Sequence, residues 1–164
     1  MEQERWWPKP MVVLASIGVC ALSEGLGALT LGDISAQLDW FMGLEQPHFA
    51  LPLQGWYLAG ALYNLVMITT LYRVWTRSPE HPARRRALWL AGGVIIGNQL
   101  AQPILFVWKS LLVNVLYIVP FCALATALWF TLRKLDRTTS HVFLIYLCWL
   151  LYDIYFFLGI WFLN

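Results

Sequence analysis

The feature that most constrains this chain is a series of five long apolar stretches separated by short polar segments. They cover residues 11–31, 56–75, 87–108, 111–132 and 142–163. Each reaches the roughly 20 residues that an α-helix needs to cross the hydrocarbon core of a bilayer. Because that core offers no water to unpaired backbone groups, we expect each stretch to be helical. The sequence therefore predicts an all-α integral membrane protein, one five-helix bundle forming a single domain over residues 1–164.

The composition argues against a soluble domain. Hydrophobic residues make up 60% of the chain and charged residues 12%, whereas soluble proteins average about 45–50% and about 25%. Three cysteines, Cys20, Cys122 and Cys148, all fall inside apolar stretches and lack the spacing of metal ligands. We therefore expect them to pack as small apolar side chains, and we expect no metal site and no cofactor.

The basic residues gather at one end of the predicted spans. The N-terminus carries Arg5 and Lys9, and only Lys109 lies at the opposite end. The other basic residues follow the second and fourth spans: Arg73, Arg77, Arg84, Arg85, Arg86, Arg133, Lys134 and Arg137. The positive-inside rule then places the N-terminus in the cytoplasm, and the first loop and C-terminus outside. The run Arg84–Arg86 has an alternative interpretation as a headgroup or nucleic-acid patch, but we favour a topology signal and expect no nucleic-acid partner.

Two carboxylates, Glu24 and Asp153, lie inside the predicted spans. At about 1.5 Å per residue, they fall roughly 10 Å and roughly 14 Å below the outer ends of the first and fifth helices. Asn64 and Asn98 fall at roughly 12–15 Å by the same count. A charged residue within a membrane costs roughly 2.5–3.5 kcal/mol on insertion scales, which makes both acids candidates for function. We call these four residues the polar layer, and interpret it as the floor of a lipid-accessible cavity.

An alternative interpretation of the polar layer remains open. Asn and Gln side chains commonly hold membrane helices together through interhelical hydrogen bonds. Gln99 and Gln102 would join the layer if their faces turn inward. For the amides we favour this structural role, and for the two acids we favour a functional one.

Aromatic residues surround the predicted layer. Candidates for cavity walls are Tyr63, Phe106, Trp149, Tyr152, Tyr155, Phe156 and Phe157. Aromatic walls suit flat, hydrophobic or cationic ligands. An aromatic stripe on a helix is also compatible with plain packing.

Several motifs resemble those of the translocator protein family, also called tryptophan-rich sensory proteins. The stretch WFMGLEQP matches the family signature W-[YF]-x-x-L-x-[KR]-P through Trp40, Phe41, Leu44 and Pro47, with Gln46 replacing the usual basic residue. The second- and third-helix motifs are matched by Leu62, Tyr63, Asn98 and Pro103. The final motif is matched by Tyr146, Leu147, Trp149, Trp161 and Asn164.

The resemblance implies a five-helix bundle, often a homodimer, with a cavity capped by the first loop. It implies tetrapyrroles, sterols and aromatic drug-like molecules as ligands. The loop over residues 32–55, stiffened by Pro47 and Pro52, is then a lid. The sequence departs from the family pattern at four further positions. Glu24 replaces a small residue, Ala101 replaces Trp, Asp153 replaces a small or hydroxyl residue, and Phe157 replaces Asn. These departures put the family's usual ligand in doubt.

Two functional hypotheses follow, and both have the lipid bilayer as a partner. The first is a binding protein for a hydrophobic small molecule of tetrapyrrole, sterol or isoprenoid type. Its ligand-binding candidates are Trp40, Phe49, Tyr63, Asn64, Asn98, Gln102, Phe106, Trp149, Tyr152 and Phe156. The second is a membrane enzyme in which Glu24 and Asp153 catalyse the isomerisation or cyclisation of an isoprenoid-like lipid by proton transfer.

Overall fold

The computed structural model describes residues 9–77 and 80–164, and these residues form six helices and no strand. The helices are α1 (Lys9–Leu31), α2 (Ile34–Met42), α3 (Leu53–Trp75), α4 (Pro82–Phe106), α5 (Leu111–Leu135) and α6 (Arg137–Leu163). The all-helical prediction is therefore confirmed. Arg5 of the predicted basic N-terminus lies outside the described residues.

The predicted number of five helices is wrong, because α2 forms inside the segment that was predicted to be a loop. Gly32 has a φ of 66°, a left-handed conformation that glycine adopts readily and that ends α1. Asp33 then begins α2, since its Oδ1 accepts hydrogen bonds from the backbone N–H groups of Ser35 and Ala36 at 3.0 and 3.3 Å. With 9 residues, α2 is too short to cross a bilayer.

Four of the long helices, α1, α4, α5 and α6, are long and apolar enough to cross a membrane. Helix α3 is not among them, although it has 23 residues and covers the second predicted span. Its sequence includes Gln54, Asn64 and Arg73 together with two glycines and several Trp and Tyr residues. Even the most apolar stretch of α3 therefore has a lower mean hydropathy than the most apolar stretches of α1, α4, α5 and α6.

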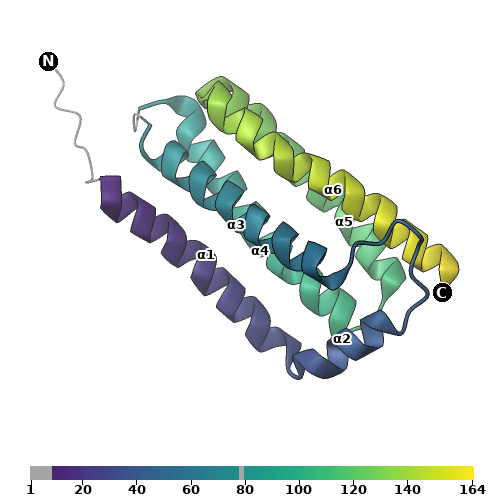
Figure 1. The fold of residues 1–164 in the computed structure, drawn as a ribbon. Coiled ribbons are helices and arrows are strands. Elements are labelled where there is room, and N and C mark those ends of the chain that lie inside the picture. The colour runs from purple at the N-terminus through teal and green to yellow at the C-terminus, as the bar shows by residue number, and fades with distance from the viewer. Residues whose placement is uncertain (1–8, 78–79) are drawn as a thin grey trace, which may run out of the picture.

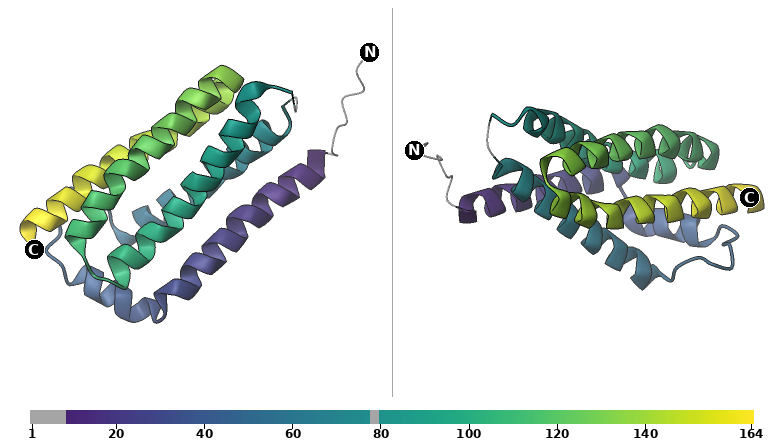
Figure 2. Two further views of the ribbon diagram at one scale, coloured as in Figure 1. Left: turned by 180° about the vertical axis from the view of Figure 1, so that it is seen from behind. Right: turned by 90° about the horizontal axis from the view of Figure 1, so that it is seen from above.

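The long helices run side by side, and α2 crosses the end of the bundle that also holds the C-terminus (Figure 1). Helix α1 lies at the edge of the bundle, where it packs on α3 and α4. Helix α4 packs on α5, α5 on α6, and α6 on α3. The views in Figure 2 show the same arrangement from behind and from above.

The buried side chains form two clusters along the bundle. The larger is centred on fully buried residues such as Met67, Leu128 and Phe143, and draws on α1 and α3 to α6. The smaller consists of Phe41, Leu105, Phe156 and Ile160, near α2 and the C-terminus. The space between the two clusters holds the candidate site described below.

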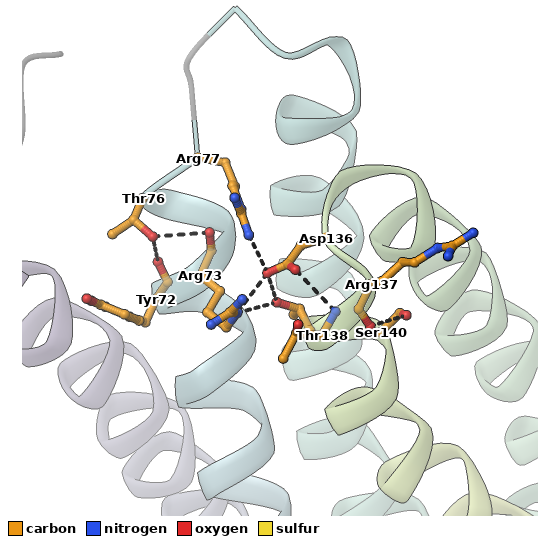
Figure 3. Close-up of polar contacts among 9 residues, drawn as sticks. Tyr72, Arg73, Thr76, Arg77, Asp136, Arg137, Thr138 and Ser140 are labelled. Carbon is orange, nitrogen blue, oxygen red and sulfur yellow. Dashed lines mark hydrogen bonds and ion pairs between the residues drawn. The ribbon is translucent and has the colours of Figure 1, made fainter. Parts of the chain in front are cut away.

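At the end of the bundle away from α2, Asp136 joins α3 to the turn between α5 and α6 (Figure 3). Its Oδ2 lies 2.7 Å from Arg73 Nε and 2.9 Å from Arg77 Nη2, and accepts a hydrogen bond from Thr139 Oγ1 at 2.6 Å. Its Oδ1 accepts the backbone N–H of Thr138 and so caps α6. One carboxylate therefore fixes three chain segments.

We expect Asp136→Asn to lower the free energy of unfolding by about 1–3 kcal/mol at neutral pH, because it removes a charged acceptor that is itself buried. Burial alone would raise the pKa of Asp136, but hydrogen bonds from Arg73, Thr139 and Arg77 outweigh it and hold the pKa well below its ordinary value. This stabilisation is therefore complete above the unfolded pKa of about 4 and is lost as pH falls through the folded pKa.

Thermal unfolding in detergent at neutral and acid pH measures this effect. Asp39→Asn is the matched control, because Asp39 is an exposed acid on α2. The difference between parent and Asp136→Asn should shrink at acid pH. If Asp136→Asn and Asp39→Asn had the same melting temperature at neutral pH, the proposed role of Asp136 would be contradicted.

Candidate functional site

A cavity of about 380 Å³ lies between the two buried clusters, and we call it the central cavity. All six helices contribute side chains to its wall. Tyr63, Phe121 and Tyr146 come from the larger cluster, and Phe41 and Leu105 from the smaller one. Its volume falls in the range of small-molecule sites, roughly 300–1,000 Å³. Its wall is mainly apolar and aromatic, with a few polar groups.

Both predicted acids, Glu24 and Asp153, line the central cavity. The predicted ligand-binding residues that line it are Tyr63, Asn98, Gln102, Phe106 and Trp149. Those that do not line it are Trp40, Phe49, Asn64, Tyr152 and Phe156. The structure thus brings together most of the residues predicted from depth and from the helical motifs. It leaves out Trp40 and Phe49 of the first loop, Asn64 of the polar layer, and Tyr152 and Phe156 of α6.

The predicted residues that do not line the cavity pack behind its wall or near α2. Phe156 is fully buried and packs on Phe41 and Trp56, with ring centroids 6.3 and 4.8 Å away. Trp40 faces Lys109, whose Nζ lies 5.4 Å from the ring centroid. Phe156 and Trp40 therefore contact other protein side chains and not the cavity.

Three of the four residues of the polar layer line the cavity, and the layer also connects helices. Asn64 Nδ2 donates to Glu24 Oε1 at 3.3 Å, which joins α3 to α1. Tyr146 Oη donates to Asn98 Oδ1 at 3.2 Å, which joins α6 to α4. The interpretations as a cavity floor and as interhelical bonding therefore apply together, and the amide groups carry most of the bonding.

Asp153 differs from the rest of the polar layer. Its Oδ1 is buried and has no hydrogen-bond partner among the described residues. Trp149 and Phe157, one turn before and one turn after it on α6, line the same cavity, so the three side chains share one face of the helix. A buried oxygen without a partner is costly. A ligand that offers a donor or a positive charge would remove that cost.

Sequence reasoning missed part of the wall. Asn114 on α5 is 4% exposed and lines the cavity with Tyr117, Ile118 and Phe121. These residues recur at helical spacing, which was the available signal for a shared face. Trp56 also lines the cavity, although its place at a span end suited a membrane-interface residue.

The segment after α2 is attached to α6. Tyr152 Oη donates to the carbonyl oxygen of Phe49 at 3.4 Å and accepts the backbone N–H of Leu51 at 3.3 Å. The Phe49 ring stacks on Tyr155 with centroids 4.3 Å apart. Asn164 exchanges two hydrogen bonds with the backbone of Glu45, at 2.9 and 3.1 Å. The segment is therefore held against the C-terminal part of α6.

Helix α2 closes one side of the cavity. Leu38, Phe41 and Met42, which follow one another at helical spacing, belong to its lining. Phe41 also contacts Trp56 and Phe106 edge to face, with centroids 6.4 and 5.7 Å apart. The first interhelical segment thus contributes directly to the wall.

A family model described as the TspO/MBR family matches residues 14–162. The chain belongs to the TspO/MBR family. The resemblance predicted from the motifs is thereby confirmed, and no curated protein matches the chain. Membership of the TspO/MBR family, together with four apolar helices, makes this a multi-pass integral membrane protein, and the family indicates a ligand-binding or transport role.

In this TspO/MBR protein the departures from the family's helical motifs meet in one place. Glu24, Ala101, Asp153 and Phe157 all line the central cavity. Ala101 stands where the motif has Trp, so a small side chain leaves space in the wall. Four of the five departures from the family motifs therefore line the central cavity, and Gln46 does not.

Proposed function

We propose that this protein binds a hydrophobic ligand of tetrapyrrole, sterol or isoprenoid type in the central cavity, beneath a lid formed by residues 32–55. The observation that carries the proposal is a cavity of about 380 Å³ walled by aromatic and apolar side chains from all six helices. Its few polar groups would orient a ligand, as in most small-molecule sites.

We also propose that α3 spans the membrane with the other long helices, giving five spans in a single domain. At about 1.5 Å per residue, its length is about 34 Å, enough to cross the bilayer. Its polar side chains have partners inside the bundle: Asn64 donates to Glu24, and Arg73 pairs with Asp136. Gly60 and Tyr63 face the cavity. The low hydropathy of α3 thus reflects its inward-facing residues. From the family resemblance we also propose a homodimer.

Saturable ligand binding tests the proposed function. The parent protein in nanodiscs is titrated with a tetrapyrrole, a sterol and a polyprenyl alcohol, and intrinsic Trp fluorescence is followed. Trp56 and Trp149 line the cavity, so a bound ligand should change their emission. We expect at least one probe to give a saturable change that empty nanodiscs lack. Purely linear partitioning for all three would reject the proposal.

Hydrogen exchange tests the lid. Tyr152→Phe removes the hydroxyl that holds Phe49 and Leu51. We expect exchange at residues 49–51 to accelerate about fivefold, which corresponds to about 1 kcal/mol for a lost hydrogen bond. Bound ligand should slow exchange over residues 32–55 in the parent. The lid would be contradicted if exchange changed neither in Tyr152→Phe nor in the parent with ligand. Tyr155→Phe, which keeps the ring stacked on Phe49, is the matched control.

Cysteine labelling tests the proposed orientation, with the N-terminus in the cytoplasm and the C-terminus and lid outside. Glu45 and Arg85 are both exposed, and the native cysteines are first replaced by Ala. A membrane-impermeant maleimide should label Glu45→Cys in intact cells and Arg85→Cys only after permeabilisation. The reverse pattern, or labelling of both in intact cells, would contradict the orientation.

A second candidate function is supported by the unpartnered oxygen of Asp153 in an aromatic-lined cavity. A protonated Asp153 would give its O–H proton to one carbon of an isoprenoid alkene and become a carboxylate. The π electrons would form the new C–H bond and leave a carbocation on the other carbon, which aromatic faces stabilise. Glu24 would then remove a proton from the adjacent carbon and shift the double bond. Under this alternative, lipid extracts incubated with the parent return altered, and Asp153→Asn abolishes turnover. Extracts that return unchanged would reject it.

A further inference from the structure

We infer that the central cavity takes a hydrophobic organic cation, with its ammonium-type head beside Asp153 and between the rings of Trp149 and Phe157. This inference rests on the proposed function: it keeps the cavity and a hydrophobic ligand, and it adds a positively charged head group that the proposed ligand types do not themselves require. A ligand of this class would present an apolar tail to the remaining wall. It would present no carboxylate to the polar layer.

The charges of the wall support a cationic ligand. Glu24 and Asp153 are the acids among the lining residues, and no Lys, Arg or His lines the cavity in the described chain. Lys109, near the same end of the bundle, is directed to the ring of Trp40, which does not line the cavity. A carboxylate-bearing ligand would bring a third carboxyl group to these two acids without a compensating base, which disfavours binding. An ammonium would meet complementary charge.

The aromatic rings around Asp153 strengthen the argument. Trp149 and Phe157 flank it on the same face of α6, and Trp56 approaches from α3. The ring centroid of Trp56 lies 5.5 Å from that of Trp149 and 6.4 Å from that of Phe157. Aromatic faces attract cations, and clusters of them recognise quaternary ammonium groups. The carboxylate and the three rings together form a site that suits such a head group.

The hydrogen bonds distinguish the two acids. Glu24 Oε1 accepts a hydrogen bond from Asn64, whereas Asp153 Oδ1 is buried without a partner. Asp153 therefore gains more from an added positive group than Glu24 does. A sterol hydroxyl could also donate to this oxygen, but it would bring no charge. A quaternary ammonium, which carries charge and donates no hydrogen bond, separates the two possibilities.

Three probes with one anthracenylalkyl tail, ending in trimethylammonium, hydroxyl or carboxylate, test the inference. Binding is measured to the parent in nanodiscs of zwitterionic lipid, with partitioning into empty nanodiscs subtracted. We expect the ammonium probe to bind at least tenfold more tightly than the alcohol, and the carboxylate more weakly than the alcohol. Asp153→Asn should bring the ammonium and alcohol affinities within twofold of each other, while Asp153→Glu retains the preference. Asp39→Asn, an exposed acid outside the cavity, should change nothing.

Equal affinities of ammonium and alcohol in the parent would overturn the inference and leave the proposed function in place. A full ammonium preference in Asp153→Asn would overturn the assignment to Asp153. If Asp153→Asn fails to fold, the ratio of ammonium to alcohol affinity is compared between the parent and Asp153→Glu. Asp153→Glu keeps the carboxylate, so loss of the ammonium preference in this variant would also count against the assignment to Asp153. If no probe binds saturably to the parent, the proposed function itself fails.

Discussion

Gly60→Phe is expected to weaken binding of the cavity ligand by about 100-fold, or about 2.7 kcal/mol. Gly60 lines the central cavity, and a Cβ built there meets no atom within 4 Å. A phenyl ring at this position would therefore occupy ligand space without displacing the backbone. Replacing a glycine inside a helix by Phe also improves helix propensity, by less than the about 1 kcal/mol that separates Gly from Ala, so we expect the variant to fold.

Gly92→Phe is the matched control for this experiment. A Cβ at Gly92 also meets no atom within 4 Å, but Gly92 does not line the cavity. Ligand affinity is measured by fluorescence titration in nanodiscs and folding by thermal unfolding. Equal affinities for the two variants, with both folded, would mean that the ligand binds elsewhere.

Gly97→Ala is expected to destabilise the protein by about 1–3 kcal/mol, the usual cost of overpacking a core. Gly97 lies where α4 meets α5, and an added Cβ would be 2.6 and 2.8 Å from two ring atoms of Phe121. The Gly97 carbonyl also accepts the hydroxyl of Tyr117 at 2.8 Å, which limits the movement of the two helices. Phe121 could relieve the clash only by shifting toward the cavity that it lines.

Gly92→Ala provides the comparison, because the same substitution there meets open space. It should raise stability by up to about 1 kcal/mol, the difference in helix propensity between the two residues. The two variants should therefore shift the melting temperature in opposite directions. Adding Phe121→Leu to Gly97→Ala should recover part of the loss. Shifts of the same sign and size would contradict the close approach of α4 and α5.

The long helices could be predicted from sequence because a bilayer imposes a minimum apolar length. Four predicted boundaries agree with the structure: α1 ends at 31, α3 ends at 75, α5 begins at 111 and α6 ends at 163. Helix α6 begins five positions early, at Arg137, because Asp136 caps it and a polar first turn lies outside the apolar stretch. Helix α2 was not predicted, because 9 residues give too short a periodic pattern and its start depends on the Gly32 conformation and the Asp33 cap.

The candidate site could be predicted to the extent that depth determines it. Counting residues from the helix ends placed Glu24 and Asp153 at one level, and both line the cavity. The count gives no rotation of one helix against another, so Asn64 was expected to face the cavity and instead donates to Glu24. Trp40 and Phe49 were expected from the loop motif, and their contacts are with Lys109 and Tyr155. Such packing partners depend on the assembled bundle.

Photo-crosslinking of an apolar diazirine probe to the parent protein in nanodiscs tests the binding site most directly. Mass spectrometry then identifies the labelled residues, with and without excess unlabelled ligand. We expect labels on cavity residues such as Met42, Trp56 and Trp149 that excess ligand displaces, and we expect these labels to be lost in Gly60→Phe. Labels confined to exposed leucines such as Leu14 and Leu26, or labels that excess ligand does not displace, would contradict it.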